Sequence, residues 1–288
     1  MKRVIVPTDF SELSIKGLEL ALLLANKMNA DIELVHVINP DENNLSLGEE
    51  KVRRANIQQS FTDIFDMFKQ QYPHILISNI VKEGKIHEEV INQAEAFSDS
   101  LIVTSTHGAS GWEEFFTGSN AYKIAASSTK PVFTIRGKTV PSQIKNIVLP
   151  LDNTPETREK VPLTAELAAL FGASVSIVTL STFDMEDVLS KLEDYALQVG
   201  KYLERFGIES TIEHLTGTNY TDITIEFAKK NKADLISVMT EQEKSITNLL
   251  LGNYAHQMIN KSPVPVLLFP TKQIGINSES FKTQGINY

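Results

Sequence analysis

The sequence predicts an α/β fold made of two tandem, doubly wound domains, each with a five-stranded parallel sheet. The first observation is length, because 288 residues exceed the usual size of one domain and allow two cores of about 140 residues each. The second is that apolar, β-branched runs alternate with longer segments of helical period, which is typical of βαβ units. The third is an internal repeat.

The repeat is visible at both ends of each half. VIVPTD at residues 4–9 recurs as IVLPLD at residues 147–152, an offset of 143 residues, and the matches near the end of each half are offset by 134. The difference indicates deletions within the second half. The anchoring pairs are Asp9 with Asp152, Gly118 with Gly252, and Pro131 with Pro265.

The pattern places each expected element in order. In the first half we expect strands at 4–7, 31–38, 75–81, 101–105 and 132–135, and helices at 11–29, 48–71, 86–97 and 119–127. In the second half we expect strands at 147–151, 174–180, 207–214, 235–239 and 264–269. The resulting division is a domain at 1–138, a linker within 137–143, a domain at 144–271 and a polar tail at 272–288.

Right-handed crossovers favour the spatial strand order 3-2-1-4-5 in each half. A ligand is then expected beyond the carboxyl ends of strands 1 and 4, where the chain reverses direction across the sheet and Asp9 approaches residues 105–119. The fifth strand of each half is an apolar edge strand, and such edges tend to pair. We therefore expect strands 132–135 and 264–269 to join the halves as an internal pseudo-dimer with pseudo-two-fold symmetry, while a homodimer of the whole chain is left open.

Composition and charge narrow the function classes. The chain has no cysteine, which excludes disulfides, thiolate nucleophiles and thiolate metal sites and favours a reducing cytoplasm. A net charge of -9 opposes nucleic-acid binding, because that binding depends on releasing counterions from phosphates. No apolar stretch approaches the ~20 residues needed to span a bilayer, so we expect neither membrane insertion nor export.

The loop after the fourth strand has the features of a phosphate-binding loop. Gly108 and Gly118 can let the backbone approach a ligand, and Ser119 adds a hydroxyl at the positive end of a helix dipole. The alternative interpretation is that the glycines merely flank a loop and Ser119 caps the helix.

Several segments together resemble the universal stress protein family. They are PTD at 7–9, HV at 36–37, GKIHEEV at 84–90, and STHG followed by nine residues and GS at 105–119. The last is similar to the motif G-x2-G-x9-G-(S/T) of the ATP-binding members, with Ser105 in place of the first glycine. The resemblance covers nearly the whole chain as two copies, and it implies a regulatory protein of the cytoplasmic stress response.

The resemblance also implies a site for ATP, AMP or another adenine nucleotide in the first repeat, with Mg²⁺ bridging the phosphates. Asp9 would lie on the adenosine side, the backbone of Val37 would meet the adenine, and the Cβ of Ser105 could weaken binding or favour a shorter nucleotide. The expected binding residues are Pro7, Thr8, Asp9, Val37, Gly84, Thr104, Ser105, His107, Gly108, Gly118, Ser119 and Asn120.

The second repeat keeps Asp152 and Gly252 but has lost the rest of the loop. Met239 and Gln242 stand where the first two glycines belong, and Asn253 replaces the serine. Two glutamates, at 241 and 243, bring negative charge to the expected phosphate position, where like charges repel. We therefore expect nucleotide binding in the first repeat alone.

No catalytic or metal-binding motif accompanies the loop. The six histidines form no HExxH pair, and neither a G-x-S-x-G elbow nor a Walker A loop occurs. His107 could touch a nucleotide, Trp112 could stack on a base, and Glu113 and Glu114 could act as a base or hold a metal, although a surface or packing role explains each. Two alternatives to a nucleotide-binding regulator remain: an interaction or scaffold protein without a ligand, and a slow ATPase.

Overall fold

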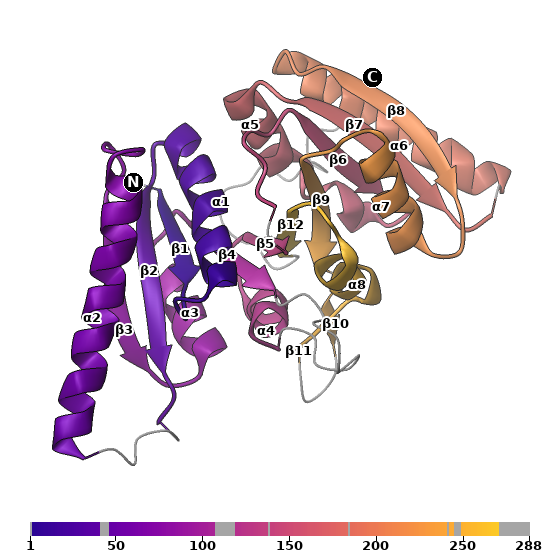
Figure 1. Cartoon of the computed structure of the whole chain (residues 1–288). Helices are drawn as coiled ribbons and strands as arrows, with labels where there is room; N and C mark the ends of the chain where they lie inside the picture. The colour runs from indigo at the N-terminus through magenta and orange to yellow at the C-terminus, as the bar shows by residue number, and fades with distance from the viewer. Residues whose placement is uncertain are drawn as a thin grey trace.

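The computed structural model describes residues 2–40, 46–106, 119–137, 139–183, 185–240, 242–244 and 249–270. These residues form two α/β repeats whose strands join into one ten-stranded sheet (Figure 1). Within these ranges, no helix combines the length and apolar character that a membrane span requires.

The first repeat has the predicted alternation and strand order. Its sheet runs β3-β2-β1-β4-β5 with all neighbours parallel, which confirms the order 3-2-1-4-5. Its elements are β1 (Arg3–Pro7), α1 (Glu12–Met28), β2 (Asp31–Ile38), α2 (Leu47–Lys69), β3 (Ile77–Glu83), α3 (Ile86–Glu95), β4 (Ser100–Thr106), α4 (Ser119–Ser127) and β5 (Val132–Arg136).

The second repeat has the same order, β8-β7-β6-β9-β12, again parallel. It adds two features that the sequence did not predict: the 3₁₀ helix η2 and the antiparallel β10–β11 hairpin. Its elements are β6 (Asn146–Leu151), η2 (Pro155–Arg158), α5 (Val161–Phe171), β7 (Ser174–Ser181), α6 (Glu186–Arg205), β8 (Ser210–Thr216), α7 (Tyr220–Lys230), β9 (Leu235–Thr240), β10 (Gln242–Lys244), β11 (Leu249–Leu251), α8 (Asn253–Lys261) and β12 (Val266–Pro270).

The two edge strands of the sheets lie further along the chain than predicted. β3 begins at Ile77 rather than 75, and β8 begins at Ser210 rather than 207. Ile75 and Ile208 are buried just before these strands, so the apolar segment begins earlier than the strand itself. The ladder to the neighbouring strand sets the true limits, and its last pairs are Ile38 with Glu83 and Ser181 with Thr216.

The last strands of the two repeats pair antiparallel, as the sequence predicted. Phe133 lies opposite Leu267 in this register, and these two residues are equivalent in the repeats, 134 positions apart. A residue that faces its own equivalent marks a two-fold axis, so the pseudo-two-fold axis passes between Phe133 and Leu267. Pro131 and Pro265 precede the two strands, and each offers only its carbonyl to the neighbouring strand.

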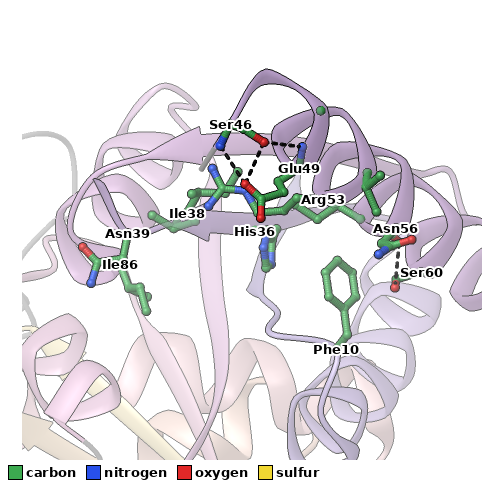
Figure 2. A pocket seen from close by; sticks show the side chains of 14 residues that line it. Phe10, His36, Ile38, Asn39, Ser46, Glu49, Arg53, Asn56, Ser60 and Ile86 are labelled. Carbon is green, nitrogen blue, oxygen red and sulfur yellow. Dashed lines mark hydrogen bonds between the residues drawn. The ribbon is translucent and has the colours of Figure 1, made fainter. Parts of the chain in front are cut away.

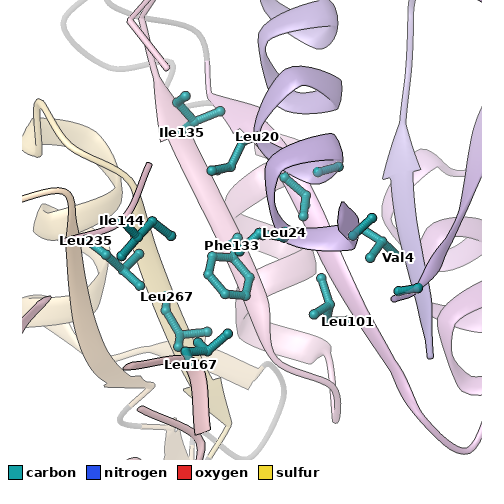
Figure 3. Close-up of a cluster of buried hydrophobic side chains, with 14 of the residues drawn as sticks. Val4, Leu20, Leu24, Leu101, Phe133, Ile135, Ile144, Leu167, Leu235 and Leu267 are labelled. Carbon is teal, nitrogen blue, oxygen red and sulfur yellow. The ribbon is translucent and has the colours of Figure 1, made fainter. Parts of the chain in front are cut away.

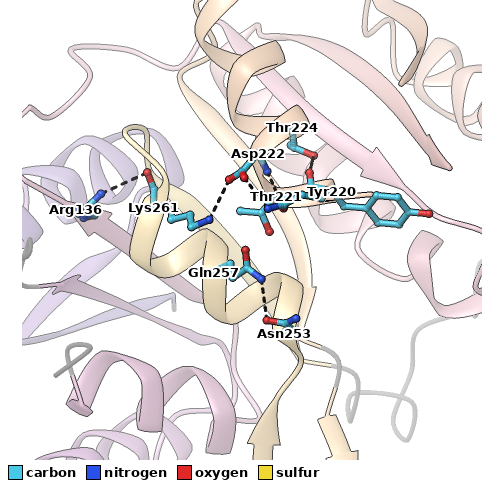
Figure 4. A network of polar contacts seen from close by, with 9 residues as sticks. Arg136, Tyr220, Thr221, Asp222, Thr224, Asn253, Gln257 and Lys261 are labelled. Atoms are coloured by element: carbon cyan, nitrogen blue, oxygen red, sulfur yellow. Dashed lines mark hydrogen bonds and ion pairs between the residues drawn. The ribbon is translucent and has the colours of Figure 1, made fainter. Parts of the chain in front are cut away.

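Polar contacts also bridge the junction (Figure 4). Arg136 of β5 donates to the backbone carbonyl of Lys261 on α8, at 3.5 Å. The ammonium of Lys261 in turn pairs with Asp222 of α7, at 3.1 Å. The junction therefore links the first repeat to two helices of the second.

Helices cover both faces of the sheet, and the core on each face is continuous through the junction. Helices α1, α2, α5 and α6 pack on one face, while α3, α4, α7 and α8 pack on the other. Figure 3 shows Phe133 between the side chains of α1 and those of the second repeat. Phe133 and Leu267 are both fully buried, so neither repeat buries this edge without the other.

Candidate functional site

A cavity of about 190 Å³ lies in the first repeat, at the carboxyl ends of β1, β2 and β4. The strand order reverses between β1 and β4, and crevices at such switch points are where open α/β sheets bind ligands. Its lining residues are Pro7, Thr8, Asp9, Ser11, Ser14, Val35, His36, Val37, Ile86, Thr104, Ser105, Asn120, Ala121 and Ile124.

Asp9 is held by the start of α1. Its Oδ1 accepts a hydrogen bond from the backbone N–H of Ser11 at 3.0 Å, and Ser11 caps the helix by accepting from the backbone N–H of Ser14. Partial burial raises the pKa of Asp9, but hydrogen bonds from Ser11 and Ser14 outweigh it, so that the pKa lies below its ordinary value. The carboxylate is therefore a charged acceptor at neutral pH.

Thr8 and His36 connect β1 to β2 beside Asp9. The carbonyl of Thr8 lies 2.9 Å from His36 Nδ1, which must carry the proton to donate to it. The Thr8 hydroxyl is 3.1 Å from that of Ser14 and accepts the backbone N–H of Phe10, also at 3.1 Å. Phe10 has a φ of 65° and stacks on His36 with ring centroids 4.7 Å apart. These contacts fix the side of the cavity on which Asp9 lies.

On the other side, the cavity is closed by the end of β4 and the start of α4. Thr104 and Ser105 come from β4, and Asn120 comes from the first turn of α4. Gly17 of α1 packs behind the strand, where a Cβ would lie 3.5 Å from the backbone nitrogen of Ser105. A small residue at position 17 thus lets helix and strand approach closely at the expected phosphate position.

Seven of the residues expected from sequence line this one cavity, but Gly84 does not. Gly84 has a φ of +147° at the β3–α3 turn, and an added Cβ would lie 3.2 Å from Glu89 Cγ, so the turn itself accounts for the glycine. His107, Gly108 and Gly118 lie outside the described residues, and Ser119 begins α4. The seven are Pro7, Thr8, Asp9, Val37, Thr104, Ser105 and Asn120.

The remaining lining residues were missed as site residues. Ser11 and Ser14 stand at a helix start, and this role alone explains their residue types. The sequence therefore does not indicate that Ser11 contacts Asp9 or that Ser14 contacts Thr8. In the sequence, His36 is marked only as part of a strand ending. The apolar side chains Val35, Ile86, Ala121 and Ile124 give no sequence signal that separates a cavity wall from a core position.

The second repeat has its own crevice at the equivalent place, of about 510 Å³. Asp152 repeats the Asp9 turn, because its Oδ1 accepts the backbone N–H of Thr154 at 2.8 Å. Lys160, which is equivalent to Gly17, lines this crevice although its side chain is almost fully buried. Its ammonium donates to the backbone carbonyl of Thr157 at 2.6 Å. A lysine side chain therefore occupies the place where the first repeat has a glycine.

The described residues contain no group of three or more histidine, cysteine, aspartate or glutamate side chains that could hold a metal ion.

Comparisons with known proteins identify the family. The sequence model of the universal stress protein family matches residues 1–136 and 143–270. The chain belongs to the universal stress protein family. The two matches coincide with the two structural repeats, so this is a tandem universal stress protein.

Relatives of this universal stress protein occur in archaea and bacteria. Universal stress protein MJ0531 of Methanocaldococcus jannaschii is 30% identical over 138 residues, which cover 43% of this chain and 81% of the relative. Universal stress protein YxiE of Bacillus subtilis is 25% identical over 150 residues, or 46% of this chain and 98% of the relative.

A solved structure has the same tandem fold. The crystal structure of a universal stress protein from Archaeoglobus fulgidus matches with a TM-score of 0.74 at 21% identity, covering 93% of this chain and 98% of that one. The likeness therefore extends across the junction between the repeats.

Proposed function

We propose that this universal stress protein binds one adenine nucleotide, ATP or AMP, in the first repeat, and acts through the bound state as a regulator in the cytoplasmic stress response. The observation that carries the proposal is the grouping of Asp9, Val37, Thr104, Ser105 and Asn120 around one cavity at the switch point. These residues come from four separate segments of the chain, and the resemblance to universal stress proteins implies a nucleotide-binding role for all five.

The cavity offers a suitable group to each part of the nucleotide. The ionised Asp9 can accept hydrogen bonds from ribose hydroxyls, and the backbone of Val37 can meet the edge of the base. Ser105 and Asn120 lie next to the start of α4, where a helix dipole favours phosphate. Gly108 and Gly118 would complete the phosphate loop, and Mg²⁺ bound with the nucleotide would offset part of the phosphate charge.

In this proposal the second repeat has a structural or regulatory role. The Lys160 ammonium at its crevice already donates to the backbone carbonyl of Thr157. Glu241 and Glu243 follow β9 in the sequence, so a polyphosphate would meet negative charge there. The second repeat supplies β12 to the junction and thereby covers the edge of the binding repeat.

Isothermal titration calorimetry of the full chain with ATP, with and without Mg²⁺, and with AMP tests the proposal. We expect one site per chain with a dissociation constant in the micromolar range, about -8 kcal/mol. Two equivalent sites would contradict the assignment to the first repeat. No binding of ATP or AMP would favour an interaction protein without a nucleotide.

A further inference from the structure

A second hollow adjoins the proposed nucleotide cavity. It is a groove of about 880 Å³ between the end of β2 and the first half of α2, and we call it the α2 groove (Figure 2). Three residues, His36, Val37 and Ile86, line both the groove and the nucleotide cavity. The groove therefore begins where the proposed base-binding end of the cavity stops.

The polar groups at the groove are largely engaged with one another. Ser46 and Glu49 form a capping box at the start of α2, in which each side chain accepts the other residue's backbone N–H. Hydrogen bonds from the Ser46 hydroxyl and backbone lower the pKa of Glu49, so this carboxylate is charged. The Arg53 guanidinium pairs with Glu50 at 2.6 Å. A phosphate would therefore meet a capped helix start, the Glu49 carboxylate and a guanidinium that is already paired with Glu50.

The groove also presents apolar and aromatic surface. Phe10, Val52, Ile57 and Ile86 line it, and the side chain of Val52 is 61% exposed. An apolar group placed there would gain from leaving water.

One wall of the groove is preformed by an unfavourable backbone conformation. Phe10 adopts a φ of 65°, which bulky residues take up only where their surroundings impose it. The Thr8 hydroxyl holds its N–H, and its ring is fixed by the stack on His36 and by an edge contact to Phe61 at 5.0 Å. The second repeat has Asn153 at the equivalent position and so lacks this aromatic wall.

We infer that the ligand of the first repeat is an adenine nucleotide whose 6-amino group carries an apolar substituent, and that the substituent fills the α2 groove. This inference rests on the proposed function. In the proposed orientation of the nucleotide, the phosphates lie toward β4 and α4, away from the groove. Only a group on the base can therefore enter the groove. The edge of adenine that can hydrogen-bond to the Val37 backbone carries the amino group, and Val37 is where cavity and groove meet.

The test compares ATP with N6-benzyl-ATP by calorimetry on the full chain. We expect N6-benzyl-ATP to bind about tenfold more tightly, since a buried benzyl group gains apolar contact at modest entropic cost. Val52→Trp would fill the groove and abolish this advantage while ATP binding stays unchanged. Leu47→Trp is the matched control, because Leu47 lies in the first turn of the same helix, is 87% exposed and does not line the groove.

Each outcome separates the inference from the proposed function. Equal or weaker binding of N6-benzyl-ATP, with ATP bound normally, overturns the inference and leaves the function standing. If neither nucleotide binds, the proposed function fails and the inference fails with it. If the groove instead holds a second copy of this chain, the two nucleotides bind equally and Val52→Trp, but not Leu47→Trp, changes the mass measured by size-exclusion chromatography with light scattering.

Discussion

Tyr122 on α4 and His256 on α8 meet edge to face, with ring centroids 4.9 Å apart and an interplanar angle of 70°. The two residues are equivalent in the repeats, separated by the same 134 positions as Phe133 and Leu267. Each repeat therefore contacts its own counterpart across the pseudo-two-fold axis, as protomers do in a symmetric dimer. Because the rings differ, this contact distinguishes the internal pair from a pair of identical repeats.

This contact predicts a pH-dependent stability. Burial lowers the pKa of His256 below its ordinary value of 6.5, so the folded chain binds this proton less readily than the unfolded chain. Stability contributed by the neutral histidine is complete above the unfolded pKa and is lost as the pH falls through the folded pKa. We expect the free energy of unfolding, measured in urea, to decrease from about pH 7 toward pH 5.

His256→Phe keeps a ring against Tyr122 and removes the titrating group. It should remove the part of this pH dependence that His256 causes. Another part should come from His87, whose pKa is also lowered, by burial first and then by the charge of Lys123. His87→Gln is therefore the comparison variant. An unchanged pH profile in His256→Phe would show that His256 does not titrate differently in the folded chain.

Separation of the repeats gives a second prediction. Cutting the chain within 137–143 exposes β5 and β12 as apolar edges, with Phe133 and Leu267 no longer covered. We expect each isolated repeat to self-associate or aggregate, and a mixture of the two to form a heterodimer. Sedimentation velocity would detect these species. Two stable monomeric halves that do not associate when mixed would contradict the proposed role of the junction.

The junction was predictable because its signals are local. Pro131 and Pro265 each precede a short, mostly apolar run at the end of a half, and right-handed crossovers leave those runs at the sheet edge. The β10–β11 hairpin was not predictable in the same way. Its residues correspond to the phosphate loop of the first repeat, and the loss of a motif does not indicate what structure replaces it.

The candidate site was predictable only where a motif marked it. Asp9 and Ser105 stand next to strand ends in recognisable segments, and Phe10 follows Asp9 directly. Val52 became a neighbour of the site only through the packing of α2 beside β2. The buried Lys160 gave no signal either, because a lysine at a helix start ordinarily lies in solvent. Its equivalence to Gly17 became informative only because the structure places Gly17 directly behind Ser105.

Gly17 carries a third prediction. Gly17→Leu should weaken ATP binding at least tenfold, because the branched side chain would push against the end of β4 and Ser105. Gly17→Ala should bind ATP as the wild type does, since its Cβ would make only an ordinary contact, 3.5 Å from the Ser105 backbone nitrogen. Calorimetry measures both, and circular dichroism checks that both fold. Equal affinities in the two variants would show that this close approach has no role in binding.

Asp9 and Asp152 allow the most direct test of nucleotide binding in the first repeat, because both close the same turn in their repeats. Loss of a charge-assisted hydrogen bond of about 1.5–3 kcal/mol predicts that Asp9→Ala weakens ATP binding by one to two orders of magnitude. Asp152→Ala should leave it unchanged. Native mass spectrometry at increasing ATP concentration counts the nucleotides on each chain. The account predicts one nucleotide on the wild type and on Asp152→Ala, and a strongly reduced bound fraction on Asp9→Ala; two nucleotides on the wild type, or a loss confined to Asp152→Ala, would contradict it.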